Sequence, residues 1–79
     1  MISDALKQLL LRQLGLDDFE IGDDTTADKV PGWDSLTHVR ILAAVEAHFG
    51  VRFSTLEAIR IRNVGELQAL IDRKATTAR

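Results

Sequence analysis

Apolar residues recur at helical spacing along this chain, and this spacing is what most restricts its fold. Three segments place an apolar side chain every three or four residues, as one face of an α-helix does. Nowhere do apolar and polar residues alternate over a useful length, as they do in a half-buried strand. A chain of 79 residues has room for one domain and buries only about 60% of the surface that its unfolded form exposes. We therefore predict a single all-α domain over residues 1–79, a small four-helix bundle with three main helices and a short third helix.

Each predicted helix begins at or directly after a capping residue, as helix starts in proteins usually do. Ser54 with Glu57 three residues later has the capping-box pattern, and Asn63 with Glu66 repeats it. A glycine follows each of the first two helices, where a left-handed residue often ends a helix. Residues 75–79 are expected to form a frayed tail. The four predicted helices are Ser3–Leu14, Ser35–Phe49, Ser54–Arg60 and Val64 to about Lys74.

The connection between the first two helices, residues 16–33, is longer than most loops in compact domains. Three apolar residues in it, Phe19, Ile21 and Val30, are candidate anchors, and Pro31-Gly32 predicts a tight turn at its end. Its acidic residues do not have the spacing of an EF-hand, so we predict a solvated charge run and no metal site.

Two sides of the second predicted helix have different characters. The first carries large apolar residues and is predicted to face the core: Val39, Leu42, Val45 and Phe49. The second lies within an arc of about 60°, is small and mixed in character, and is predicted to be exposed: Leu36, Arg40, Ala43 and Ala47.

Composition excludes several classes of function. The chain has no cysteine and only two histidines, which excludes disulfides and thiolate chemistry and argues against a structural zinc site. Its net charge is −2, whereas a nucleic-acid binder usually presents a basic face. No apolar run approaches the roughly 20 residues of a membrane span, and no signal peptide is visible. We expect a cytoplasmic monomer that binds neither nucleic acid nor membranes.

Ser35 holds the most informative position, because it follows a Pro-Gly-Trp-Asp turn and opens the longest predicted helix. A hydroxyl there lies beside backbone N–H groups that favour an anion such as a phosphate ester. The simpler interpretation is that Asp34 and Ser35 only cap the helix. His38 is a near neighbour, but a serine hydrolase also needs an acid to orient the histidine and an oxyanion hole. The Gly-x-Ser-x-Gly elbow is absent, so we predict that the chain is not an enzyme.

The stretch Gly-Trp-Asp-Ser-Leu at 32–36 resembles the acyl carrier protein family, and so do the residues downstream of it: Val39, Leu42, Glu46, Phe49, Gly50 and Val51. The resemblance covers nearly the whole chain. It implies that a phosphopantetheinyl transferase attaches a 4′-phosphopantetheine arm from coenzyme A to Ser35. The arm would carry acyl groups as thioesters for acyl-loading, condensing or tailoring enzymes. Asp34 would orient the modification site, and Leu36 would contact partners beside the arm.

The exposed side of the second helix departs from the family pattern. In fatty-acid carriers this side is typically acidic with a central methionine, whereas here it presents Arg40, Ala43 and Ala47 beside Leu36. Because charge reversal at an interface mainly changes partner choice, the resemblance suggests a specialised polyketide-like or secondary-metabolite pathway. Housekeeping fatty-acid synthesis fits less well. These four residues are the predicted partner face.

Acyl chains in this family can lie between the second and third helices, and the candidate lining residues here are Leu42, Val45, Ile59 and Ile61. Trp33 is predicted to anchor the long loop, and His38 to lie on the surface beside the arm. Two alternatives remain open. A peptidyl or aminoacyl carrier would share the fold and the arm, although Trp33-Asp34 favours the acyl type. An unmodified helical interaction module would not accept the arm on Ser35.

Overall fold

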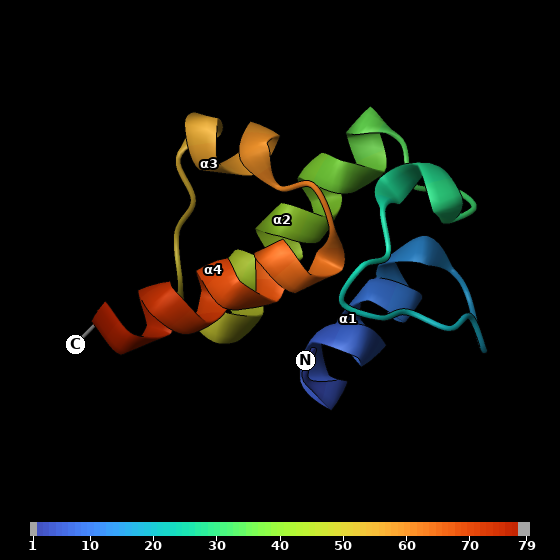
Figure 1. The fold of residues 1–79 in the computed structure, drawn as a ribbon, viewed down its shortest axis with the longest axis horizontal. Helices are drawn as coiled ribbons and strands as arrows, with labels where there is room; N and C mark the ends of the chain where they lie inside the picture. Colours follow the sequence, from blue (N-terminus) through green and yellow to red (C-terminus); the bar gives the residue numbers. More distant parts are fainter. Residues whose placement is uncertain (1, 78–79) are drawn as a thin grey trace.

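Four α-helices and one short 3-10 turn make up the computed structural model, which describes residues 2–77 (Figure 1). Within this range there is no strand, so the all-α prediction is confirmed. None of the described helices is long and apolar enough to cross a membrane. The elements are α1 (Asp4–Leu14), the 3-10 turn η1 (Ala27–Lys29), α2 (Ser35–Phe49), α3 (Thr55–Arg60) and α4 (Val64–Thr77).

The local signals at the helix ends act as the sequence indicates. Ser3 caps α1, with its hydroxyl oxygen accepting the backbone N–H of Leu6. Ser54 and Glu57 form both hydrogen bonds of a capping box at the start of α3. The last helix continues to Thr77, beyond the predicted end near Lys74, so residues 75–77 are helical. The other two residues of the predicted frayed tail, 78 and 79, lie outside the described range.

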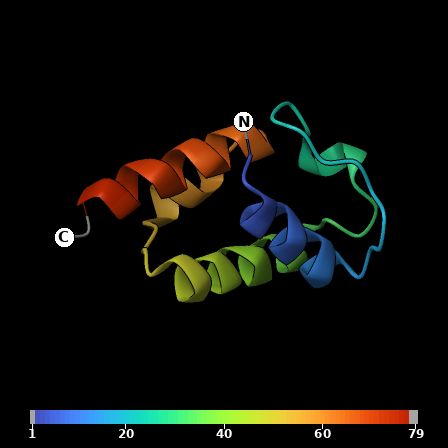
Figure 2. The same cartoon turned by 90° about the horizontal axis from the view of Figure 1, so that it is seen from below.

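The core lies where α1, α2 and α4 meet. Figure 2 shows α2 and α4 on opposite sides of the molecule, with α1 between them at one end. Three pairs of large side chains, one pair from each of these helices, are at most 2% exposed: Leu6 and Leu10, Ile41 and Val45, Leu67 and Ile71. By contrast, α3 contributes no fully buried residue. The short helix therefore lies at the edge of the bundle.

The predicted core face of α2 is partly wrong. Val39 is 63% exposed, whereas Ile41, two positions further along, is completely buried. Leu42 and Val45 are buried as predicted, and Phe49 only packs against the edge of the core. Apolar residues occur on several sides of α2, so periodicity alone did not define its rotation. The positions of α1 and α4 decide which of these residues are covered.

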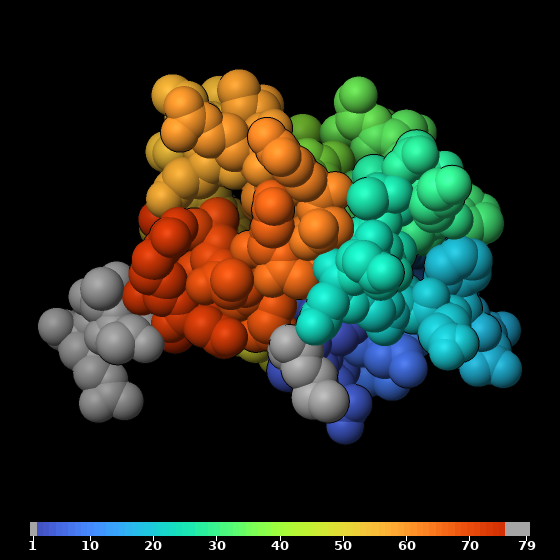
Figure 3. Space-filling model, viewed as in Figure 1, coloured from blue at the N-terminus to red at the C-terminus, as the bar shows by residue number. Residues whose placement is uncertain are grey.

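The acidic loop is tied to the start of α4 by backbone hydrogen bonds. The carbonyl of Asp23 accepts the N–H of Gly65 at 2.7 Å, and that of Thr25 accepts the N–H of Val64 at 2.9 Å. These bonds satisfy donors that have no partner inside the helix. The space-filling view shows the loop against the beginning of α4 (Figure 3). Of the three predicted anchors of the loop, Ile21 and Val30 are buried, and Phe19 is partly buried against the core.

Replacing Gly65 by alanine is expected to destabilise the fold by about 1–3 kcal/mol, the usual range for overpacking. A Cβ at this position would lie 2.7 Å from the carbonyl oxygen of Asp23, and backbone cannot move away as a flexible side chain can. Urea denaturation measures the effect. Gly22→Ala is the matched control, because its Cβ would meet only the Asp24 carboxylate at 3.7 Å. Equal unfolding midpoints for the two variants would contradict this packing.

Candidate functional site

Ser35 is the first residue of α2, but it is not the residue that caps the helix. Asp34 does that, since its Oδ1 accepts the backbone N–H of Thr37 at 2.8 Å. The other two serines of the chain, Ser3 and Ser54, both use their hydroxyl oxygens as caps. Ser35 is exposed, and its hydroxyl makes no hydrogen bond within residues 2–77. Its oxygen is therefore available at the start of a 15-residue helix.

A tight turn fixes the backbone just before this serine. The carbonyl of Val30 accepts the N–H of Trp33 at 3.3 Å, and Gly32 between them has φ of 83°. This is the arrangement that a Pro-Gly pair at the centre of a turn favours. Val30 is buried, and Trp33 packs against the core, so both ends of the turn are held in place. It delivers the chain directly to Asp34 and Ser35.

Trp33 and His38 form a contact that joins the loop, α2 and α3. The indole Nε1–H donates to His38 Nδ1 at 3.2 Å, and the two rings stack with centroids 6.1 Å apart. The other ring nitrogen of His38 lies 3.2 Å from the carbonyl oxygen of Ala58 in α3. Trp33 packs against the core, which confirms its predicted role as an anchor. His38 was predicted as a helix-surface residue beside the arm, but it is half-buried between elements, because both of its ring nitrogens have partners there.

The electrostatics at the start of α2 favour a charged Asp34. The backbone N–H of Thr37 is the main cause that holds the pKa of its carboxyl below the ordinary aspartate value, and the Thr37 side chain adds to it. The helix start also places partial positive charge beside residue 35. A phosphodiester on Ser35 fits this position, because the hydroxyl is exposed and the neighbouring N–H groups favour an anion.

The lowered pKa of Asp34 predicts a pH dependence of stability. A carboxyl whose pKa is lower in the folded state stabilises the fold above its unfolded pKa, about 3.9 for aspartate, and this contribution is lost as the pH falls through the folded value. Asp34→Asn keeps a capping side chain but cannot titrate. The quantity compared is the melting temperature of the native chain minus that of Asp34→Asn. We expect this difference to fall as the pH is lowered below about 3.9. A constant difference would contradict the assignment.

The predicted partner face is exposed along α2, as the spacing indicated: Leu36, Arg40, Ala43 and Ala47. Three further large apolar side chains that sequence analysis did not assign to this surface are also exposed: Val39 at 63%, Leu56 at 51% and Ile59 at 74%. With Leu36 at 61%, four large apolar side chains are exposed, two on α2 and two on α3. The i, i+3 spacing of 36 with 39 and of 56 with 59 was the signal that could have revealed them.

The predicted acyl-binding residues do not line one cavity. Leu42 and Val45 are part of the packed core, whereas Ile59 is 74% exposed, so the assignment of these residues to one acyl-binding site stays a prediction. Ile59 is exposed because α3 is short and buries no residue fully, which leaves its large apolar side chains outside.

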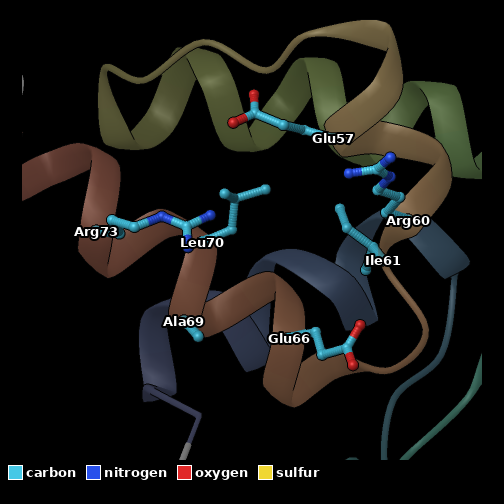
Figure 4. A pocket seen from close by; sticks show the side chains of 7 residues that line it. All are labelled: Glu57, Arg60, Ile61, Glu66, Ala69, Leu70 and Arg73. Atoms are coloured by element: carbon cyan, nitrogen blue, oxygen red, sulfur yellow. The ribbon is translucent and has the colours of Figure 1, made fainter.

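A separate open hollow lies between α3 and α4, with a volume of about 440 Å³ (Figure 4). Beside it, Lys74 bonds Glu57 at 2.8 Å and is the main cause that lowers the pKa of that carboxyl. Of the four predicted acyl-binding residues, Ile61 is the one that lines it, together with Glu57, Arg60, Glu66, Ala69, Leu70 and Arg73.

Comparison with known proteins identifies the class and then the family. The model of the family described as phosphopantetheine attachment site matches residues 4–71, from the first residue of α1 to Ile71, a buried residue of α4. An acyl carrier protein of Solidesulfovibrio magneticus is 30% identical over 73 residues, which are 92% of this chain and 94% of that protein. The chain belongs to the acyl carrier protein family. The cofactor of this family is 4′-phosphopantetheine, covalently attached.

Solved structures show the same arrangement of helices. The solution structure of the holo acyl carrier protein from Geobacter metallireducens superposes with a TM-score of 0.89 at 29% identity, covering 95% of this chain and 86% of that one. The acetyl actinorhodin acyl carrier protein from Streptomyces coelicolor gives a TM-score of 0.76 at 26% identity, covering 100% and 95%.

Proposed function

We propose that Ser35 is the attachment point of the phosphopantetheine arm and that the chain carries acyl groups as thioesters without catalysing their chemistry. The observation that carries this proposal is that Asp34, and not Ser35, caps α2. Asp34 caps the helix, so the Ser35 hydroxyl remains exposed and without a hydrogen bond among the described residues. A serine needed only as a cap would bond the helix N–H groups, as Ser3 and Ser54 do.

The surroundings of Ser35 favour a carrier over a hydrolase. The nearby imidazole of His38 is engaged at both ring nitrogens, by Trp33 and by the Ala58 carbonyl. A general base for a serine nucleophile would have to hydrogen-bond the hydroxyl, and His38 does not. The arm supplies a thiol on which an acyl group is held. The protein presents the serine outward on a capped helix, with Leu36 exposed next to it.

Acyl loading tests this function. The chain is incubated with acetyl-coenzyme A and a broad-specificity phosphopantetheinyl transferase, and then treated with hydroxylamine, which cleaves thioesters. We expect a mass gain of one acetylated arm, from which hydroxylamine removes only the acetyl group. A folded chain that takes up nothing while a reference carrier is modified would support an unmodified docking module instead. An acetyl group resistant to hydroxylamine would contradict the thioester.

We further propose that the exposed side of α2 is the face that partner enzymes bind, and that these partners belong to a specialised pathway. The face consists of Leu36, Arg40, Ala43 and Ala47, all of which are exposed. Its single charged residue is a cation, which favours partners that present carboxylates there. The likeness to the actinorhodin carrier, at 26% identity, supports a polyketide-like pathway.

Arg40→Glu is expected to slow association with the cognate condensing enzyme roughly tenfold at low salt, because steering by charge acts mainly on the association rate. Stopped-flow measurements at two salt concentrations would show the loss and its screening. Arg12→Glu is the control, since Arg12 is also exposed but lies on α1. Faster association of the Arg40 variant would contradict an acidic partner surface.

A further inference from the structure

We propose that His38 is a positioning residue that links the turn before Ser35 to α3 only while its imidazole is neutral, so that protonation breaks this link. The three groups involved are the indole of Trp33, the imidazole of His38 and the backbone carbonyl of Ala58. They come from three separate elements: the turn before α2, the first part of α2, and α3. The proposal concerns the protein without its arm and does not depend on the proposed function.

The hydrogen bonds define which nitrogen of His38 holds the proton. An indole N–H can only donate, so Nδ1, at 3.2 Å from it, must accept with its lone pair. The neutral ring then carries its proton on Nε2, which lies 3.2 Å from the Ala58 carbonyl oxygen and donates to it. Both bonds are satisfied at once by this single tautomer.

Protonation is incompatible with the bond to Trp33. The added proton would go to Nδ1, which then becomes a donor that faces the indole N–H, another donor. The stacked rings, 6.1 Å apart, would have to separate or turn. The bond between Nε2 and Ala58 could persist only if the imidazolium kept its present position.

The contact between His38 and Ala58 matters because α3 has few other contacts that hold it to the rest of the bundle. No residue of this helix is fully buried, although Ala58 packs partly against the core. The ion pair between Glu57 and Lys74 also connects α3 to α4. Loosening the His38 contact should therefore allow α3 to move relative to Trp33, which stands two residues before Ser35.

The elements around the imidazole of His38 carry charged residues of both signs. Arg62, from the link between α3 and α4, lines the same small cavity of about 20 Å³ as His38. Asp34, the cap of the same helix, lies one turn earlier. From α3 the nearest acid in sequence to Ala58 is Glu57, which is neutralised by its ion pair. The turn η1 reaches the cavity through Ala27, beside Asp28.

Nuclear magnetic resonance of the ¹⁵N-labelled, unmodified chain tests the proposal. At about pH 8 the imidazole ¹⁵N shifts of His38 should report the Nε2–H tautomer. On lowering the pH to about 5, through the range in which imidazoles titrate, the indole N–H signal of Trp33 and the α3 amides should shift with the same midpoint as His38. Trp33 is the only tryptophan, so its signal is unambiguous.

Two histidine variants and the rate of amide exchange in α3 complete the test of this proposal. His38→Gln cannot titrate in this range and should abolish the shared transition, whereas His48→Gln, which replaces the other histidine, should keep it. Amide exchange in α3, corrected for its intrinsic pH dependence and referenced to α4, should be roughly two- to tenfold faster after protonation, the factor expected from one hydrogen bond. An Nδ1–H tautomer at high pH, a transition that survives in His38→Gln, or α3 amides that do not respond would each overturn the proposal.

Discussion

Ile41→Ala is expected to lower the free energy of unfolding by about 2–5 kcal/mol, the usual cost of truncating a fully buried isoleucine. Ile41 is 0% exposed and packs in the core of the bundle. The lost methyl groups leave a cavity that neighbouring helices fill only in part. Since small domains are stable by about 5–15 kcal/mol in total, this one change removes a large share. Urea denaturation followed by circular dichroism measures it.

The matched control is Ile59→Ala, the same replacement on α3. Ile59 is 74% exposed, so the change should stay within about 0.5 kcal/mol of the native chain. Val39→Ala tests the rotation of α2 in the same way, because Val39 is exposed. If Val39→Ala were as damaging as Ile41→Ala, the helix would face the core with a different side.

Ser35→Ala is expected to abolish attachment of the arm completely while leaving the melting temperature within about 2 °C of the native value, because a surface substitution away from a cap has little effect on stability. The phosphoryl group needs the serine oxygen as its acceptor. The fold does not need it, since Asp34 caps α2. Intact mass after reaction with coenzyme A and a transferase, together with a thermal melt, measures both effects.

Ser54→Ala should show the reverse pattern. Its hydroxyl accepts the N–H of Glu57 as the cap of α3, so its loss should cost about 1 kcal/mol of stability and leave attachment intact. An arm that still attaches to Ser35→Ala would show that another hydroxyl is the acceptor. A variant that unfolds would show that Ser35 is structural after all.

The sequence was sufficient to predict features of the fold that depend on neighbouring residues alone. Helix starts depend on one side chain and a few N–H groups, so Asp34 and Ser54 could be assigned as caps from their neighbours. Ser35 was singled out by its place after the Pro-Gly turn and by the family motif around it. The exposed side of α2 also followed from spacing, because it contains small and charged residues.

Prediction from sequence was insufficient where the outcome depends on packing between distant segments. Val39 and Ile41 are equally apolar, and only the placement of α1 and α4 decides which is covered. The outward orientation of Ile59 depends in the same way on how α3 lies at the edge of the bundle. The contact of His38 with Ala58 spans 20 positions of sequence and leaves no periodic signal. The close approach of Gly65 to Asp23 likewise requires the folded loop.

Peptide mapping of the modified chain tests the central claim most directly. After reaction with coenzyme A and a transferase, trypsin should release residues 30–40, bounded by Lys29 and Arg40, and this peptide contains one serine and one threonine, Ser35 and Thr37. We predict that the mass of one phosphopantetheine arm is confined to this peptide and that fragmentation places it on Ser35. An arm on Thr37 or on any other peptide, or an unmodified peptide from a folded chain treated with an active transferase, would contradict the assignment of Ser35 as the carrier site.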